Sequence, residues 1–125
     1  MKIAEVSKRY GIPQETLRYY ERVNVIPKIA RENGIRNFTE DDCIWVQFAK
    51  CLRAAGLSVE AIIEYRRLTL IGDSTIEARC ELLKSEREKL IDQKRSIDEA
   101  LELLNYKVSR YEEAVKTGVL SWDKK

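Results

Sequence analysis

The sequence predicts a mainly α-helical protein in which several short helices precede one long helix. Residues 74–115 contain no proline or glycine and repeat an apolar side chain every seven positions. Before them, glycine, proline and capping residues divide the chain into short helices with little strand. We therefore expect three segments: a domain over residues 1–72, here called the head, a long helix over residues 73–116, and a short tail over residues 117–125.

The first two helices are predicted to form a helix-turn-helix. Ile3 and Val6 fall on one face of the first helix, and the Gly11-Ile12-Pro13 stretch makes a tight turn whose proline suits the start of the second. The second helix is expected to end near Val23. A proline and a glycine interrupt residues 24–37, so this stretch is expected to be an irregular loop with room for a short wing.

Capping residues mark the next three helices. Thr39 is predicted to cap the third helix, with Asp42 three residues later as a variant of the capping box. Ser58 is predicted to cap the fourth, and a glycine follows each of these two helices and is expected to end it. The Ser74–Glu77 stretch has the full Ser-x-x-Glu pattern and is expected to begin the long helix.

The long helix carries an apolar seam at heptad spacing. At 1.5 Å per residue it would extend roughly 60 Å, and the rest of the chain offers too little apolar surface to cover it. We therefore expect it to pair with the same helix of a second chain, giving a homodimer, rather than to pack along its own head. The predicted dimerisation residues are Ile76, Leu83, Leu90, Ile97, Leu104 and Tyr111.

Basic residues are concentrated near the N-terminus. The whole chain has a net charge of +2, but residues 1–39 hold eight Lys or Arg against four Glu, an excess that suits a polyanionic partner. On the second helix Arg18, Tyr19 and Arg22 share one face. Arginine can bind guanine or phosphate, and a tyrosine hydroxyl can donate to phosphate. Arg18 and Tyr19 are therefore the leading predicted contacts to double-stranded DNA, and a dimer of two heads would require an inverted repeat.

Other protein classes fit the sequence poorly. An enzyme is not expected, because the chain has no histidine and no glycine-rich phosphate loop, and no cofactor is expected. No apolar run reaches 18 residues and nothing at the start resembles a signal peptide, so we expect a cytoplasmic protein without a membrane span. Three cysteines without tight spacing argue against a disulfide framework.

Four segments, in their order and spacing, resemble the MerR family of bacterial transcription regulators: Thr16–Arg22, Gly34–Phe38, Lys50–Ser58 and the long helix. The resemblance spans essentially residues 1–115. It implies a winged helix-turn-helix followed by a dimerisation helix in an antiparallel coiled coil. It also implies that the dimer sits between widely separated promoter elements, and that the activated form bends and untwists the DNA so that RNA polymerase engages both.

The resemblance adds four residues to the predicted DNA contacts. Thr16 and Tyr20 come from the second helix, Arg36 from the wing and Arg53 from the end of the third helix. Tyr20 also fits a core position, and Arg53 also fits a solvated charge.

Within the family, the Lys50–Ser58 segment most resembles the aldehyde- and electrophile-responsive regulators of the AdhR/NmlR type, which makes Cys51 the candidate sensor thiol. In that hypothesis an electrophile adds to Cys51 and shifts how the two heads sit. The helical spacing of Cys51 with Ile44 and Phe48 favours a buried structural cysteine instead, and both interpretations stay open. Cys43 ranks below Cys51 because acidic neighbours disfavour a thiolate.

A metal-responsive regulator of the same family is one alternative. Metal-sensing relatives place cysteines after the long helix, whereas no cysteine follows Cys80 here, so no metal site is predicted, although Cys80 could pair with a cysteine of the partner chain. The tail is too short for the ligand-binding domain of drug-sensing relatives. A coiled-coil interaction module without an effector is the other alternative, but it leaves the basic second helix unexplained.

Overall fold

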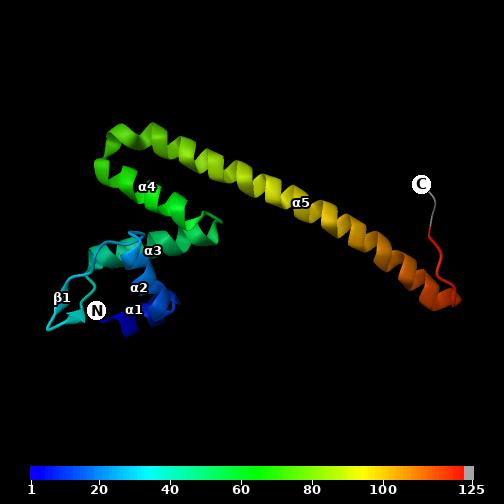
Figure 1. Ribbon diagram of the computed structural model, residues 1–125, viewed down its shortest axis with the longest axis horizontal. Helices are drawn as coiled ribbons and strands as arrows, with labels where there is room; N and C mark the ends of the chain where they lie inside the picture. Colours follow the sequence, from blue (N-terminus) through cyan, green and yellow to red (C-terminus); the bar gives the residue numbers. More distant parts are fainter. Residues whose placement is uncertain (123–125) are drawn as a thin grey trace. The chain divides into compact units, whose positions relative to one another are not determined.

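The computed structural model describes residues 1–122, and these are mainly helical (Figure 1). The predicted fold class, with a helix-turn-helix and wing before a long C-terminal helix, is confirmed. A first compact unit runs from Met1 to Glu86, past the predicted boundary at residue 72, and a second begins at Arg87. The elements in chain order are α1 (Ile3–Tyr10), α2 (Gln14–Arg22), β1 (Arg31–Glu32), β2 (Ile35–Arg36), α3 (Glu40–Ala54), α4 (Val59–Ile71), the 3-10 turn η1 (Asp73–Thr75) and α5 (Ile76–Thr117).

The turn between α1 and α2 is fixed by hydrogen bonds around Ser7. Gly11 adopts a left-handed backbone with φ 67°, which glycine accepts without strain. The Ser7 hydroxyl donates to the Ile12 carbonyl oxygen at 2.6 Å, and the Ile12 amide donates to the Ser7 carbonyl oxygen at 3.2 Å. Val6 of α1 and Leu17 of α2 are both buried in one core, so the turn sets the two helices against each other.

The predicted wing is a two-stranded antiparallel hairpin in which Arg31 pairs with Arg36 and Glu32 with Ile35. Its two turn residues, Asn33 and Gly34, both have positive φ, at 53° and 78°. Two-residue hairpin turns of this kind match the right-handed twist of the strands and favour an Asn-Gly sequence. The chain therefore makes the wing with a turn that its own sequence specifies.

The predicted caps of α3 and α4 are present. The Thr39 hydroxyl accepts from the Asp42 amide at 3.1 Å, and the Asp42 carboxylate accepts from the Thr39 amide at 2.9 Å, which completes the capping box. The Ser58 hydroxyl accepts from the Ala61 amide at 3.1 Å at the start of α4. Both helices therefore begin where the sequence indicated.

The buried face of α3 differs from the expected one. Cys43, Val46 and Ala49 are buried, whereas Ile44 and Phe48 are about half exposed and Cys51 is exposed. Of the two interpretations left open for Cys51, the buried structural cysteine is contradicted by its exposure. Both faces of α3 carry apolar side chains, and the one that contacts α1 and α4 is the Cys43 face.

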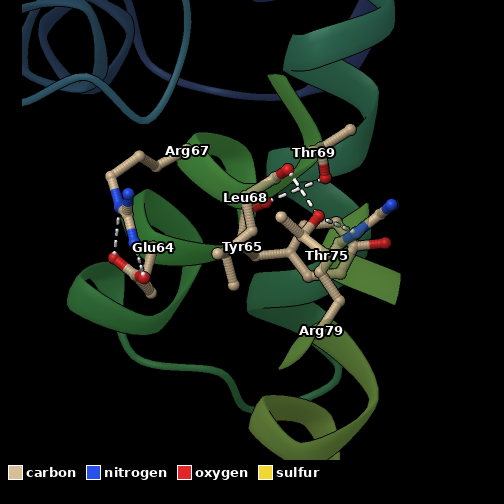
Figure 2. Close-up of polar contacts among 7 residues, drawn as sticks. All are labelled: Glu64, Tyr65, Arg67, Leu68, Thr69, Thr75 and Arg79. Carbon is tan, nitrogen blue, oxygen red and sulfur yellow. Dashed lines mark hydrogen bonds and ion pairs between the residues drawn. The ribbon is translucent and has the colours of Figure 1, made fainter. Parts of the chain in front are cut away.

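The corner between α4 and α5 is held by Thr75 and Arg79 (Figure 2). The Thr75 hydroxyl lies 2.7 Å from the carbonyl oxygens of both Leu68 and Gly72. Arg79 donates to the Thr75 hydroxyl and to the Gly72 carbonyl oxygen, each at 3.1 Å. The turn η1 thus precedes α5, which begins at Ile76 instead of at the predicted Ser74–Glu77 capping box.

The first turns of α5 belong to the first unit. Leu82 packs against the core of the head, and the Glu86 carboxylate accepts from both the amide and the hydroxyl of Ser58 at 3.3 Å. These contacts join the start of α5 to the start of α4.

The helix α5 has no buried residue in the single chain. The six predicted seam residues are between 38% and 66% exposed, so each leaves a large apolar area in water. In residues 1–122, no helix combines the length and the apolar character needed to cross a bilayer.

Candidate nucleic-acid interface

A basic groove lies between α2 and the wing. It has a volume of about 520 Å³, and four of its six lining side chains are Lys or Arg. Such a concentration of fixed positive charge beside an exposed helix face suits a phosphate backbone. The lining residues are Arg18, Glu21, Arg22, Asn24, Lys28 and Arg36.

Glu21 holds the wing against α2. Its carboxylate accepts from the Arg36 guanidinium at 2.7 Å and from the Ile29 amide at 2.8 Å. The side chain of Glu21 is only 12% exposed and that of Arg36 only 21%. Burial would raise the pKa of Glu21, but the hydrogen bonds from Arg36 and Ile29 and the charges of Arg36 and Arg31 outweigh it and lower that pKa below 4.5. Arg36 is therefore fixed in the groove by a charged partner.

Three predicted contacts on α2 remain accessible. Arg18 is exposed and donates to the Gln14 side chain at 3.3 Å. Tyr19 is 38% exposed, and the Arg22 guanidinium lies 5.4 Å from the centroid of its ring. Thr16 is partly buried. Arg18 and Tyr19 thus present a cation and a hydroxyl-bearing ring on the outer face of the helix.

Tyr20 and Arg53 have structural partners of their own. The side chain of Tyr20 is only 8% exposed and belongs to the core, the alternative that its sequence position allowed. Arg53 is exposed and donates to the Leu57 carbonyl oxygen at 2.7 Å, which satisfies a backbone acceptor just after α3 ends. DNA contacts from both residues stay predictions.

Two basic residues of the groove, Arg22 and Lys28, are absent from the predicted contacts. Arg22 shares a helix face with Arg18, so its spacing was a usable signal. Lys28 lies in the loop after Pro27, where no periodicity applies. Only the excess of positive charge in residues 1–39 pointed to it.

A second hollow lies between α1 and α3 and contains Cys51. It has a volume of about 660 Å³. The Gln47 side-chain amide donates to the Cys51 sulfur at 3.4 Å, and Phe48 stands beside it, 45% exposed. The other lining residues are Arg9, Tyr10, Glu40, Cys43, Ile44 and Lys50.

Cys43 lies in the same hollow but is only 2% exposed. Burial raises the pKa of its thiol, and the charge of Glu40 raises it further, although a hydrogen bond with Tyr10 acts in the opposite direction. This effect agrees with ranking Cys43 below Cys51 as a nucleophile. Among residues 1–122, no three His, Cys, Asp or Glu side chains lie close enough together to hold a metal ion.

A helix-turn-helix with a basic groove between its second helix and a hairpin defines a DNA-binding protein of the winged type. Residues 1–68 match the model of the MerR HTH family regulatory proteins. The chain belongs to this family, and it is a transcriptional regulator and not an enzyme.

Among its relatives, the HTH-type transcriptional regulator AdhR of Bacillus subtilis strain 168 is 52% identical over 93 residues, which cover 74% of this chain and 66% of AdhR. A MerR family regulator from Listeria monocytogenes is similar in structure, with a TM-score of 0.79 and 39% identity, covering 94% of this chain and 90% of that one. HiNmlR, a MerR family regulator that lacks the sensor domain and was crystallised bound to promoter DNA, has a TM-score of 0.73 and 32% identity, with 95% of both chains covered. The resemblance to the AdhR/NmlR branch is therefore confirmed.

Proposed function

We propose that the protein binds double-stranded promoter DNA as a homodimer at an inverted repeat. The observation that carries this proposal is the basic groove between α2 and the wing. In this arrangement α2 enters the major groove, where Arg18 and Tyr19 face the bases and phosphates, and Arg36 of the wing lies over the backbone. HiNmlR, which is similar over 95% of the chain, was crystallised with promoter DNA.

The dimer forms through the seam of α5. Six apolar side chains at heptad spacing are exposed in the single chain, and pairing with a second copy in an antiparallel coiled coil removes them from water. Two heads related by a twofold axis then read two half-sites. The bound dimer distorts the promoter so that RNA polymerase engages both of its elements, which activates transcription.

Cys51 is the sensor in this proposal. It is exposed, and it borders a hollow with apolar walls that an aldehyde or another thiol-reactive molecule can enter. The Cys51 sulfur attacks the carbonyl carbon of the aldehyde, and a carbon–sulfur bond forms as the carbonyl π bond breaks. The proton lost by the thiol is transferred through water to the carbonyl oxygen, which gives a hemithioacetal. The adduct occupies the space beside Phe48 and changes how α3 packs against α1.

The DNA-binding part is tested by gel-shift titration with a promoter fragment at several salt concentrations. For a DNA binder of this kind, the logarithm of the binding constant falls linearly with the logarithm of the salt concentration. The Arg18→Ala variant should bind about 1–3 kcal/mol more weakly if Arg18 reads a base. Arg67→Ala, which removes an exposed arginine of α4 that is outside the groove, is the control. Wild-type affinity in a folded Arg18→Ala protein would contradict the assignment.

The sensor part is tested with a promoter reporter exposed to formaldehyde or methylglyoxal. Cys51→Ser should abolish induction while leaving DNA binding intact. Cys80→Ser is the matched control, because Cys80 is also exposed but is not part of the hollow. Full induction in the Cys51→Ser strain would refute the sensor role without affecting the DNA-binding proposal.

A further inference from the structure

The residues after α5 fold back onto its last turns. Gly118 reverses the chain with φ 79°. Arg110 then donates to the carbonyl oxygen of Ser121 at 2.8 Å and to its hydroxyl at 3.0 Å. These bonds join residues eleven positions apart, so the segment before residue 123 has a defined place on the helix.

Trp122 completes an aromatic cluster at this end of α5. Its ring lies 5.9 Å from that of Tyr111 in an edge-to-face arrangement and 6.1 Å from that of Tyr106. The Lys107 ammonium is 5.5 Å from the centroid of the Trp122 ring. Aromatic pairs at these distances are favourable beyond their buried area. The tail therefore places Trp122 directly beside Tyr111, the last residue of the dimerisation seam.

This end of the chain remains apolar and exposed in spite of the folded tail. Trp122 is 46% exposed, and the other apolar side chains around it range from 42% to 84%. Apolar groups gathered in this way mark an interaction surface. We call this set the tail patch, and it consists of Tyr111, Val115, Val119, Leu120 and Trp122.

A second exposed apolar set lies at the corner between α4 and α5. Leu70, Ile71 and Ile76 are 61%, 57% and 58% exposed, and we call them the corner patch. Thr75 and Arg79 donate hydrogen bonds to the backbone carbonyl oxygens of this corner. The corner patch is therefore an exposed apolar surface on a hydrogen-bonded corner.

The seam register brings the two patches together across the dimer. An antiparallel pair that buries all six seam positions of both copies places Leu90 opposite Ile97, Leu83 opposite Leu104, and Ile76 opposite Tyr111. Tyr111 belongs to the tail patch and Ile76 to the corner patch. The residues that follow Tyr111 in one copy then lie alongside the residues that precede Ile76 in the other copy.

The charges of the two regions are complementary. Residues 70–81 hold three acidic residues and one basic residue, a net charge of −2. Residues 106–120 hold three basic and two acidic residues, a net charge of +1. Opposite charges around an apolar contact favour this pairing over tail against tail.

We propose that the tail patch of each copy docks on the corner patch of the other copy. This inference rests on the proposed homodimer and goes beyond it, because it gives the C-terminal tail a role as a clamp. Each tail covers the joint where the partner's head meets its long helix. The clamp therefore stabilises the dimer and restrains that joint in both subunits.

Disulfide trapping between two different variants tests the contact. In a background with Cys51→Ser and Cys80→Ser, one protein carries Ile71→Cys and the other Leu120→Cys. The two are unfolded together in urea, refolded and oxidised. A band of twice the chain mass should appear in the mixture and in neither protein alone. Glu60→Cys, at the start of α4, replaces Ile71→Cys as the control and should give no such band. Equal yields from the Ile71 and Glu60 positions would overturn the proposal.

Sedimentation of the full chain separates this inference from the homodimer itself. Trp122→Ala should raise the dimer dissociation constant at least about tenfold, as expected for a buried tryptophan anchor. Glu113→Ala, an exposed change in the same part of α5, should leave it unchanged. A wild-type chain that sediments as a monomer would refute the proposed homodimer. A dimeric wild type with an unchanged constant in Trp122→Ala would refute the clamp alone.

Discussion

Replacing Glu21 with glutamine should loosen the wing. The Glu21 carboxylate accepts two short hydrogen bonds, one from the Arg36 guanidinium and one from the Ile29 amide. A glutamine side chain has one oxygen to accept with, so its amide group would face one of the two donors. A hydrogen bond to a charged group contributes about 1.5–3 kcal/mol. Losing one of the two bonds should therefore lower the free energy of unfolding by about 2 kcal/mol at neutral pH.

The pH dependence of this loss follows from the lowered pKa of Glu21. A carboxyl group whose pKa is depressed on folding stabilises the protein above its unfolded value, here 4.5. That contribution is lost as the pH falls through the lower pKa of the folded protein. The variant lacks it at every pH, so the difference between the two proteins should shrink in acid.

Urea unfolding at one fixed protein concentration and a series of pH values measures the effect. Glu15→Gln makes the same chemical change on an exposed position of α2 and should stay within about 0.5 kcal/mol of the wild type. A Glu21→Gln protein as stable as the wild type at neutral pH would refute the reasoning. So would a difference that remained constant into acid, because it could not come from the ionised carboxylate.

Three further changes probe the groove, the core and the corner. Lys28→Ala should weaken DNA binding for all sequences alike and reduce the salt slope by about one, measured by fluorescence anisotropy; an unchanged slope would exclude a phosphate contact. Tyr20→Ala should lower the free energy of unfolding by about 3–5 kcal/mol because its ring is in the core, and a loss of DNA affinity without loss of stability would show instead that Tyr20 acts at the interface. Thr75→Val should cost about 1–3 kcal/mol by leaving carbonyl oxygens without their donor, and a neutral result in thermal unfolding would mean that Arg79 alone holds the corner.

The helices could be predicted because their signals are local. The cap of α3 joins Thr39 to Asp42, and the cap of α4 joins Ser58 to Ala61. Each cap links residues three positions apart, so the whole interaction lies within a short sequence pattern. The Asn33-Gly34 turn is equally local, although only a loop with room for a wing was expected there. The heptad spacing of α5 is likewise a property of one face of a single helix, so it can be recognised without knowledge of any tertiary contact.

The features that sequence reasoning missed depend on contacts between distant segments. The helix α3 carries apolar side chains on two faces, and only packing against α1 and α4 decides that Cys43 is buried while Cys51 is exposed. The Glu21–Arg36 pair spans fifteen residues, and no spacing rule indicates it. At the start of α5, Thr75 reaches back seven residues to Leu68, and this bond determines the corner where the Ser74–Glu77 pattern predicted a simple cap.

The hydrogen bonds between Ser58 and Glu86 have a practical consequence for the design of truncated fragments. A fragment that ends at residue 72, the domain boundary that the sequence predicts, would lack Leu82, which packs against the apolar core, and the Glu86 carboxylate, which accepts from the Ser58 amide at the start of α4. The smallest piece that keeps these contacts ends after Glu86. If a shorter fragment unfolds or binds DNA weakly, the result would therefore give no information about the basic groove between α2 and the wing.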